Sequence, residues 1–214
     1  NICIGYYAGG LITTASLNLA VGHYALQRCT TGTRNTSLGR RVLEDVTTED
    51  DNTGVGYNAL AQNTASDNTA VGASAASANT TGTRNTAVGK SAFSANTTGS
   101  KNVAIGENAL LSNTTADDNT AVGVGALDAN TTGASNTALG RNTLTDNTTA
   151  SNNTAVGASA LLANTTGSTN NAFGANSLDA NTTGSSNVAM GKDAMGANTT
   201  GSTNTGVGHD ALKT

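Results

Sequence analysis

Apolar and polar positions alternate over a short segment that recurs along the whole chain. The segment ends in a glycine that recurs with a period of 17 from Gly5 to Gly208, with one step of 16 between Gly56 and Gly72. The residue before this glycine is always apolar, the one before that is always small, and the third is Thr or aliphatic in all copies but one. Such alternation predicts a short strand with one buried face. We expect the apolar and Thr positions to point inward and the small position to point outward, where it would let another backbone come close.

The rest of the unit contains a second apolar pair and then a polar segment. The pair is seen at Ala109-Leu110, and the polar segment has the full form Asn-Thr-Thr-Gly, as at residues 96–99. Asn and Gly favour turns, and we expect the glycine of this segment to take a left-handed conformation. The single lost residue falls between positions 63 and 67, where a loop would absorb it.

A unit this short cannot bury its own apolar face, but stacked copies can. The sequence therefore predicts an all-β fold, a parallel β-solenoid or β-roll of about thirteen 17-residue coils, in a homo-oligomeric fibre. At about 4.8 Å per coil the rod would be roughly 60 Å long. Residues 1–214 form a single repeat domain, with 1–51 as three atypical repeats and 52–214 as regular ones. A repeat made of a strand and a helical turn remains an alternative.

Stacked copies would align identical residues in columns. An Asn stands four residues before the repeated glycine in every copy, and the amides of such a column can bond to the copies above and below. The glycine is expected to need a positive φ or a close approach of another backbone. The residues that we assign to this ladder and its turn are Asn85, Gly89, Asn102, Gly106, Asn119 and Gly123.

Composition agrees with a repeat and disfavours several other classes. The chain has 38 Thr, 28 Asn and 26 Gly, with 36% hydrophobic and 3% aromatic residues, which is too few large apolar side chains for a globular core. With 11% charged residues and no Pro it is unlike disordered chains, and its net charge of −4 disfavours nucleic-acid binding. No apolar run is long enough for membrane insertion. The chain begins at Asn1 without a Met or a signal peptide, so we expect a processed or excerpted piece.

Two segments resemble a short motif that is repeated in other proteins. Asn-Val-Ala-Ile-Gly at 102–106 and Asn-Thr-Ala-Val-Gly at 85–89 resemble the core motif of trimeric autotransporter adhesin heads. The longer unit, which adds Ala-Leu and Asn-Thr-Thr-Gly, is similar to repeats of phage tail fibres and bacterial surface fibres. The resemblance implies a left-handed parallel β-roll built from three chains. The period of 17 is longer than the usual adhesin unit.

Chemistry-bearing residues are few. His23 and His209 occupy the same column but would lie about 50 Å apart, so they cannot share a metal. Cys3 and Cys29 occupy non-equivalent places, and we expect no bond between them. We find no catalytic, cofactor-binding or metal-binding constellation, and predict a protein that is not an enzyme.

Two repeats depart from the pattern. Residues 40–51 of the third repeat are rich in charge, which fits a cation site, a contact patch or, most simply, a solvated loop that neutralises itself. The first repeat is apolar and aromatic, with Tyr6 and Tyr7, and would serve either as a cap or as a docking surface for a preceding segment.

Glycosylation sequons recur in the turn segment. They are candidate sites only if these side chains are exposed, because an Asn ladder explains the same column. The eight regular ones are Asn79, Asn96, Asn113, Asn130, Asn147, Asn164, Asn181 and Asn198, and two more stand at Asn35 and Asn152.

The leading functional hypothesis is a structural and adhesive fibre segment, on a virion or outside a cell. Its partners would be other copies of itself, as a homotrimer or stacked end to end, and a cell-surface glycan or receptor. A second hypothesis is the subunit of a self-assembling filament. A third is ice binding, because a Thr column eight residues after the glycine is unbroken from Thr13 to Thr199. A polysaccharide-cleaving enzyme ranks lower still, since clustered carboxylates are lacking.

Overall fold

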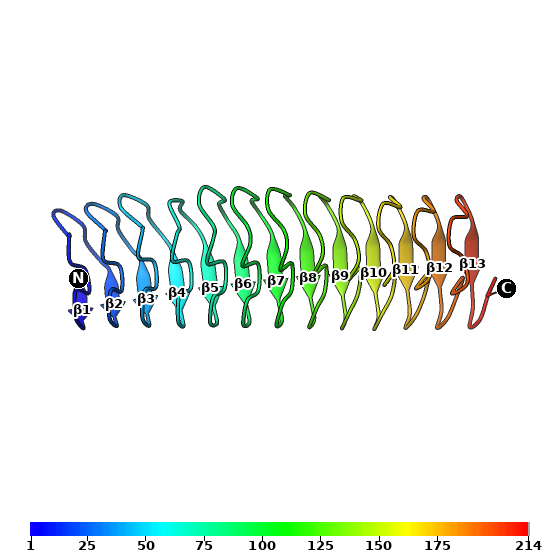
Figure 1. The fold of residues 1–214 in the computed structure, drawn as a ribbon, viewed down its shortest axis with the longest axis horizontal. Coiled ribbons are helices and arrows are strands. Elements are labelled where there is room, and N and C mark those ends of the chain that lie inside the picture. The colour runs from blue at the N-terminus through cyan, green and yellow to red at the C-terminus, as the bar shows by residue number, and fades with distance from the viewer. Residues whose placement is uncertain (214) are drawn as a thin grey trace.

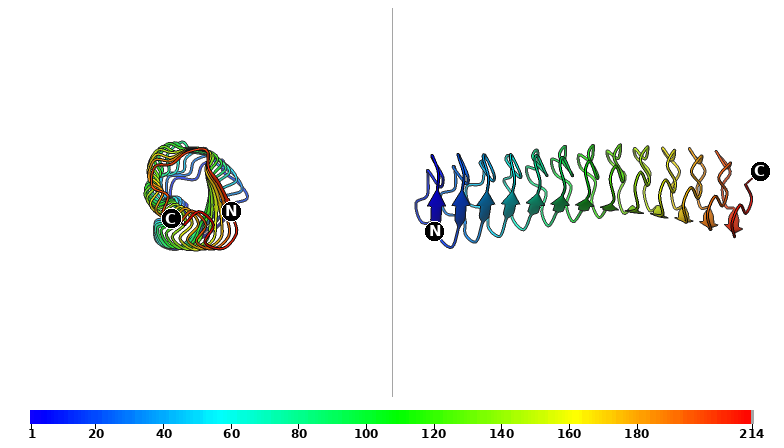
Figure 2. Two further views of the ribbon diagram at one scale, coloured as in Figure 1. Left: turned by 90° about the vertical axis from the view of Figure 1, so that its right-hand side faces the viewer. Right: turned by 90° about the horizontal axis from the view of Figure 1, so that it is seen from below.

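The protein is a rod of stacked coils. The computed structural model describes residues 1–213, and each coil contributes one three-residue strand to a single parallel sheet whose strands follow sequence order (Figure 1). Seen along the rod, the coils superimpose with a gradual rotation from one end to the other (Figure 2). The strands are β1 (Ile2–Ile4), β2 (Leu19–Val21), β3 (Thr36–Leu38), β4 (Thr53–Val55), β5 (Thr69–Val71), β6 (Thr86–Val88), β7 (Val103–Ile105), β8 (Thr120–Val122), β9 (Thr137–Leu139), β10 (Thr154–Val156), β11 (Asn171–Phe173), β12 (Val188–Met190) and β13 (Thr205–Val207). The predicted β-solenoid is confirmed, and the strand-plus-helix alternative is wrong because residues 1–213 contain no helix.

Equivalent residues of successive coils pair in register throughout the sheet. Thr86 pairs with Val103, one full period later, whereas Thr53 pairs with Thr69, which follows it by one residue less than a full period. The lost residue therefore does not shift the pairing. The turn segment absorbs it, because a slip within the sheet would have exchanged the two faces of every later strand.

The strands turn the opposite face to the interior from the one that we expected. The small central residues are fully buried, as at Ala87 and Ala104, whereas Thr86 and Val88 on either side are partly exposed. The prediction of an inward Val and Thr face is wrong. The interior is already filled by the second apolar pair, such as the fully buried Leu110, so the opposing strand has room only for Ala, Ser or Gly.

Core volumes compensate between neighbouring coils. The column of buried Leu is interrupted by Ala76, and the next coil carries the larger Phe93, which is fully buried. Val42 replaces the usual Ala where the facing strand has Gly54, and a Cβ at Gly54 would collide with the Val42 side chain. Close packing of this kind leaves little space for a change in one coil alone.

Two separate constraints require glycine at the repeated position. Gly106 has φ 133°, and a Cβ there would lie 2.5 Å from the carbonyl oxygen of Gly123 in the next coil. Both expected reasons, a positive φ and a close backbone approach, hold at this position. The glycine of the turn segment differs. Gly99 is not left-handed, as we had predicted, and is needed instead because a Cβ would collide with the Ala116 carbonyl oxygen.

Three further positions of the regular coil are left-handed although they carry side chains. In one coil they are Lys101 (φ 58°), Asn108 (φ 59°) and Leu110 (φ 51°). This conformation costs about 1–2 kcal/mol for a residue with a Cβ. It is offset because each of these N–H groups donates to a neighbouring coil, at 2.9 Å for Lys101, 3.1 Å for Asn108 and 2.9 Å for Leu110. The hydrogen bonds between coils thus extend well beyond the short strands.

Candidate interaction surfaces

The first Asn ladder lies inside the rod, just before each strand. The Oδ1 atom of Asn85 accepts the backbone N–H of Asn102 at 2.9 Å, and Asn102 accepts that of Asn119 at 2.9 Å. The Nδ2 group of Asn102 donates to the carbonyl oxygen of Ala116 at 2.9 Å. The glycines that we grouped with this ladder, Gly89 and Gly123, have φ 135° and 140°. The ladder supports the coil and offers no group to a ligand.

The second Asn ladder contains the eight regular sequons. Asn130 is fully buried, and its Nδ2 donates to Asn113 Oδ1 at 2.9 Å and to the Gly133 carbonyl oxygen at 2.9 Å. The same burial holds for the other members except Asn198, which is half-buried. They are Asn79, Asn96, Asn113, Asn147, Asn164 and Asn181. In the folded rod these amides face inward and have no room for a glycan.

The two additional sequons differ from each other. Asn35 is fully buried in the first ladder, where its Nδ2 donates to the Glu49 carbonyl oxygen at 2.8 Å. Asn152 is exposed and precedes the buried Asn153. Among the predicted glycosylation sites, Asn152 alone presents an exposed side chain on the described coils.

The hydroxyl groups of the unbroken Thr column form hydrogen bonds within the rod. Thr97 Oγ1 donates to the Thr114 carbonyl oxygen at 3.0 Å, and Thr165 Oγ1 donates to that of Thr182 at 3.0 Å. A hydroxyl hydrogen that already bonds to the next coil is not free to order water. This geometry disfavours the ice-binding hypothesis in the form in which the sequence suggested it.

One face of the sheet carries an uninterrupted apolar column toward solvent. We call the first and third residues of all thirteen strands the outer face, which has no charged residue. Its third-position column is entirely apolar, with exposed fractions of 38% at Ile105, 37% at Leu139 and 48% at Met190. The first-position column is mostly Thr. A contiguous apolar column of this length in contact with solvent is typical of an interaction surface.

The charged third repeat is paired in part with Arg34 of the preceding repeat. Arg34 Nε lies 2.6 Å from Asp51 Oδ1, and Arg41 Nε lies 2.6 Å from Glu44 Oε2. The hydrogen bond from Arg34 holds the pKa of Asp51 below its usual value. Such pairs at the surface are worth little to stability. Residues 40–51 carry five carboxylates against two arginines, so the segment does not neutralise itself. It is a solvated loop only in part, because Val42, Leu43 and Val46 are buried in the core.

The first repeats carry an exposed aromatic cluster. Tyr6 and Tyr7 are 63% and 54% exposed, and their ring centroids are 4.5 Å apart. The His23 ring lies 5.2 Å from Tyr6 and 4.1 Å from Tyr24. In the fourth coil, Tyr57 is 47% exposed. These rings belong to the first, second and fourth coils.

The opposite end holds the one group of three metal-ligating side chains found in residues 1–213. Candidate ligand atoms of Asp193, His209 and Asp210 lie within 4.8 Å of one another. Both carboxylates already have lysine partners, however, at 3.4 Å from Lys192 to Asp193 and 2.7 Å from Lys213 to Asp210. The Lys213 ammonium lowers the pKa of Asp210. We regard the group as a surface ion-pair network.

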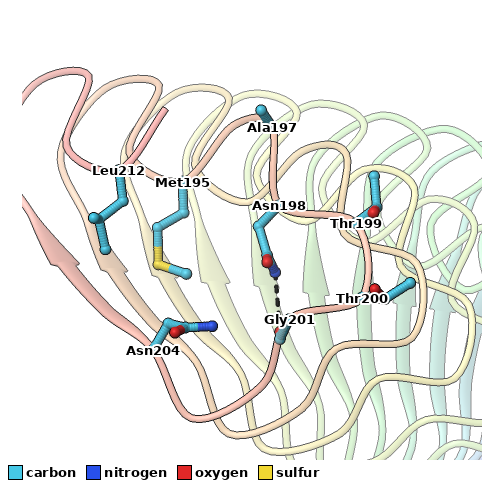
Figure 3. A pocket seen from close by; sticks show the side chains of 8 residues that line it. All are labelled: Met195, Ala197, Asn198, Thr199, Thr200, Gly201, Asn204 and Leu212. Carbon is cyan, nitrogen blue, oxygen red and sulfur yellow. Dashed lines mark hydrogen bonds between the residues drawn. The ribbon is translucent and has the colours of Figure 1, made fainter. Parts of the chain in front are cut away.

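A hollow of about 340 Å³ opens at the same end of the rod. Figure 3 shows Met195 and Leu212 along one side of it and Asn198 bonded to Gly201 on the other. These residues belong to the core column and the second Asn ladder, so the hollow is the uncovered interior of the last coils. A further coil stacked on it, from the same or another chain, would cover it.

The two cysteines are free. Cys3 is exposed in the first coil, whereas Cys29 is buried and its Sγ lies 3.5 Å from the Gly32 carbonyl oxygen. Burial raises the pKa of the Cys29 thiol, so it stays protonated and unreactive.

Comparisons with models of protein families, with curated proteins and with solved structures give no match. Within residues 1–213 there is no helix of the length and apolarity that crossing a membrane requires. The functional surfaces must therefore be judged from their own geometry. Sequence reasoning missed the outer face, although its signal, a column without any charge, is present in the sequence.

Proposed function

We propose that this chain is a non-catalytic segment of an extracellular or virion fibre, in which rods associate side by side through the outer face. The observation that carries the proposal is the apolar column, which continues along the whole rod on a face without charge. A strip roughly 60 Å long and about 10 Å wide has an area on the order of 600 Å², which approaches the roughly 800 Å² per partner of a stable interface. Neighbouring columns would supply the remainder.

Association also supplies what the single chain lacks. The interior of a regular coil holds at most one large apolar side chain, such as Leu127, among buried Ala and Asn. A core this thin stabilises a coil weakly, and covering Val and Ile side chains between rods adds buried apolar area. The fibre would hold its adhesive surface at a distance from its anchor.

Mass measurement by light scattering, with cryo-EM of the same sample, tests this proposal. We expect a defined oligomer of side-by-side rods at micromolar concentration. The double variant Ile105→Lys, Val122→Lys should dissociate it, because opposed ammonium groups would be buried. Ser135→Lys is the matched control, since Ser135 is exposed and the equivalent residue two coils earlier is Lys101. A wild-type chain that stays monomeric up to 100 times that concentration would overturn the proposal.

A second candidate is a filament of rods stacked end to end. In such a filament β13 of one rod would pair with β1 of the next; within residues 1–213 these strands pair only with β12 and β2. The hollow shown in Figure 3 would be covered by the same contact. A filament grows without a fixed mass and is insensitive to charges on the outer face, so the same measurements separate the two candidates.

A further inference from the structure

An exposed set of planar side chains runs over the first four coils. All four tyrosines of the chain lie in it, at Tyr6, Tyr7, Tyr24 and Tyr57. Tyr7 and Tyr24 stack obliquely with centroids 5.9 Å apart and an interplanar angle of 31°. Such rings in contact with water, on a chain with 3% aromatic residues, form a concentrated apolar surface.

The aromatic set continues into a polar hollow. Backbone hydrogen bonds link its coils in sequence, from Tyr24 to Tyr6 at 3.0 Å, from Arg41 to His23 at 2.9 Å and from Asn58 to Arg40 at 3.1 Å. The hollow has a volume of about 230 Å³. Its lining includes Arg41, Glu44, Asp45, Asn58, Gln62 and Ser77.

One polar atom of this hollow has no partner within the described chain. Asn58 Oδ1 is buried and accepts no hydrogen bond, alone among buried side-chain oxygen and nitrogen atoms of residues 1–213. An unpaired buried acceptor costs about 1–3 kcal/mol, and a donor from a ligand would recover it. Oδ1 has almost no accessible surface in this conformation, so a donor from a ligand reaches it only after rotation of the Asn58 amide, which lines the hollow.

The charge of the hollow disfavours an ionic ligand. Glu44 is paired with Arg41 at 2.6 Å, and Asp45 is paired with Arg28 at 2.9 Å. Arg40 lies over the Tyr57 ring, 5.6 Å from its centroid. With both carboxylates already neutralised by guanidinium groups, neither an anion nor a cation gains a strong partner here.

We propose that the aromatic set and the adjoining hollow together form a binding site for a neutral glycan. This inference rests on the proposed adhesive function and assigns its partner. The flat faces of a pyranose ring carry C–H bonds, which pack against the negative faces of tyrosine rings. The hydroxyl groups at its rim both donate and accept, and they match the amides, paired carboxylates and guanidinium groups of the hollow. After rotation of its amide, Asn58 Oδ1 accepts one of these hydroxyl hydrogens.

The chain offers a direct reporter for this site. It contains no Trp, and every Tyr belongs to the aromatic set, so tyrosine fluorescence reports on this surface alone. The full chain is screened on an array of immobilised neutral and acidic oligosaccharides, and the strongest neutral one is then titrated in solution. We expect a saturable change of fluorescence that is unaffected by raising the salt from 0.05 to 0.5 M, since no ion pair forms.

Variants separate the site from a general effect on the rod. Tyr24→Ala and Asn58→Leu should each weaken binding about fivefold to tenfold, which corresponds to the loss of one aromatic or hydrogen-bonded contact. Phe173→Ala, which changes an exposed ring on the outer face far along the rod, is the control and should bind normally. Thermal melting establishes that each variant is folded.

Three results would overturn the proposal. They are the absence of any glycan bound above background, binding that Tyr24→Ala and Asn58→Leu leave unchanged, and binding only to acidic glycans that disappears at high salt. Each is independent of rod association, because the outer-face variant Ile105→Lys, Val122→Lys is titrated in parallel. A monomeric rod that binds glycan would remove the association proposal alone.

Discussion

The Nδ2 group of Asn147 donates to Asn130 Oδ1 in the preceding coil at 2.9 Å and to the Ala150 carbonyl oxygen in its own coil at 3.0 Å. Both side chains are fully buried. One amide thus fixes the shape of its own turn and the spacing to its neighbour. A polar residue takes the place of a large apolar core residue, which suits an interior this narrow.

Removing one Asn side chain from this ladder should destabilise the rod. In Asn130→Ala, Asn113 Oδ1 loses the donor it is bonded to in the buried ladder, while Asn147 Nδ2 and the Gly133 carbonyl oxygen each keep one of two partners. One unsatisfied buried acceptor costs about 1–3 kcal/mol and the two weakened groups add to this, so we expect a loss of roughly 2–4 kcal/mol in urea unfolding followed by circular dichroism. Thr132→Ala, at an exposed position of the same turn without a positive φ, should change stability by under about 0.5 kcal/mol. Equal effects of the two variants would contradict the ladder.

The repeated glycine should not tolerate even a methyl group. In Gly106→Ala, the new Cβ would lie 2.5 Å from the Gly123 carbonyl oxygen, at a φ of 133°. We expect a loss of at least about 3 kcal/mol, from strain and from displacement of the next coil. Gly125→Asn is the control, because its φ of 67° is one that Asn142 adopts at the same place in the next coil with φ 54°. It should unfold within about 1 kcal/mol of the parent chain.

The two thiols should react at very different rates. Cys3 is exposed, whereas burial raises the pKa of Cys29 and shields its sulfur. Alkylation with iodoacetamide at pH 8, followed by mass spectrometry, should modify Cys3 alone in the folded rod and both cysteines in urea. Rapid labelling of Cys29 without denaturant would contradict the described packing of the second coil.

Asp128 should make stability depend on pH. Desolvation raises its pKa in the folded rod, so the folded state binds this proton more tightly than the unfolded state does. Its contribution to stability is therefore favourable at acid pH and is lost as the pH rises from the unfolded toward the folded pKa. We expect Asp128→Asn to raise the melting temperature on the order of 1 °C at pH 7 and to have no effect at pH 3. Asp146→Asn, at an exposed place, is the control.

Periodicity determined most of the architecture. A glycine and an Asn at fixed places in thirteen copies required coils that stack in register, and the lost residue after Gly56 could lie only in the turn. The same columns located the ladder through Asn102. These features follow from the sequence because neighbouring coils are nearly identical, so a residue's own column is its environment.

Which face of each strand points inward could not be predicted in this way. Alternation of Thr86, Ala87 and Val88 states that the two faces differ, yet which face is inside depends on how much room the closed coil leaves opposite Leu110. That volume depends on the shape of the whole closed coil. The left-handed conformations of the Leu and Asn residues could not be predicted for the same reason, since only hydrogen bonds to neighbouring coils offset the conformational cost of a positive φ.

The features of the candidate sites also fall into those that the sequence determined and those that only the tertiary structure decided. The sequence by itself determined the repeat, the ladders and the absence of charge on one column, because these are properties of composition at fixed spacing. Only the tertiary structure decided that Ala faces inward and Val outward, that the sequon amide of Asn130 is buried, and that Asn58 Oδ1 lacks a partner beside the tyrosines. Exposure and hydrogen bonding are decided by how the coil closes, and that closure depends on contacts between residues that the linear pattern does not bring together.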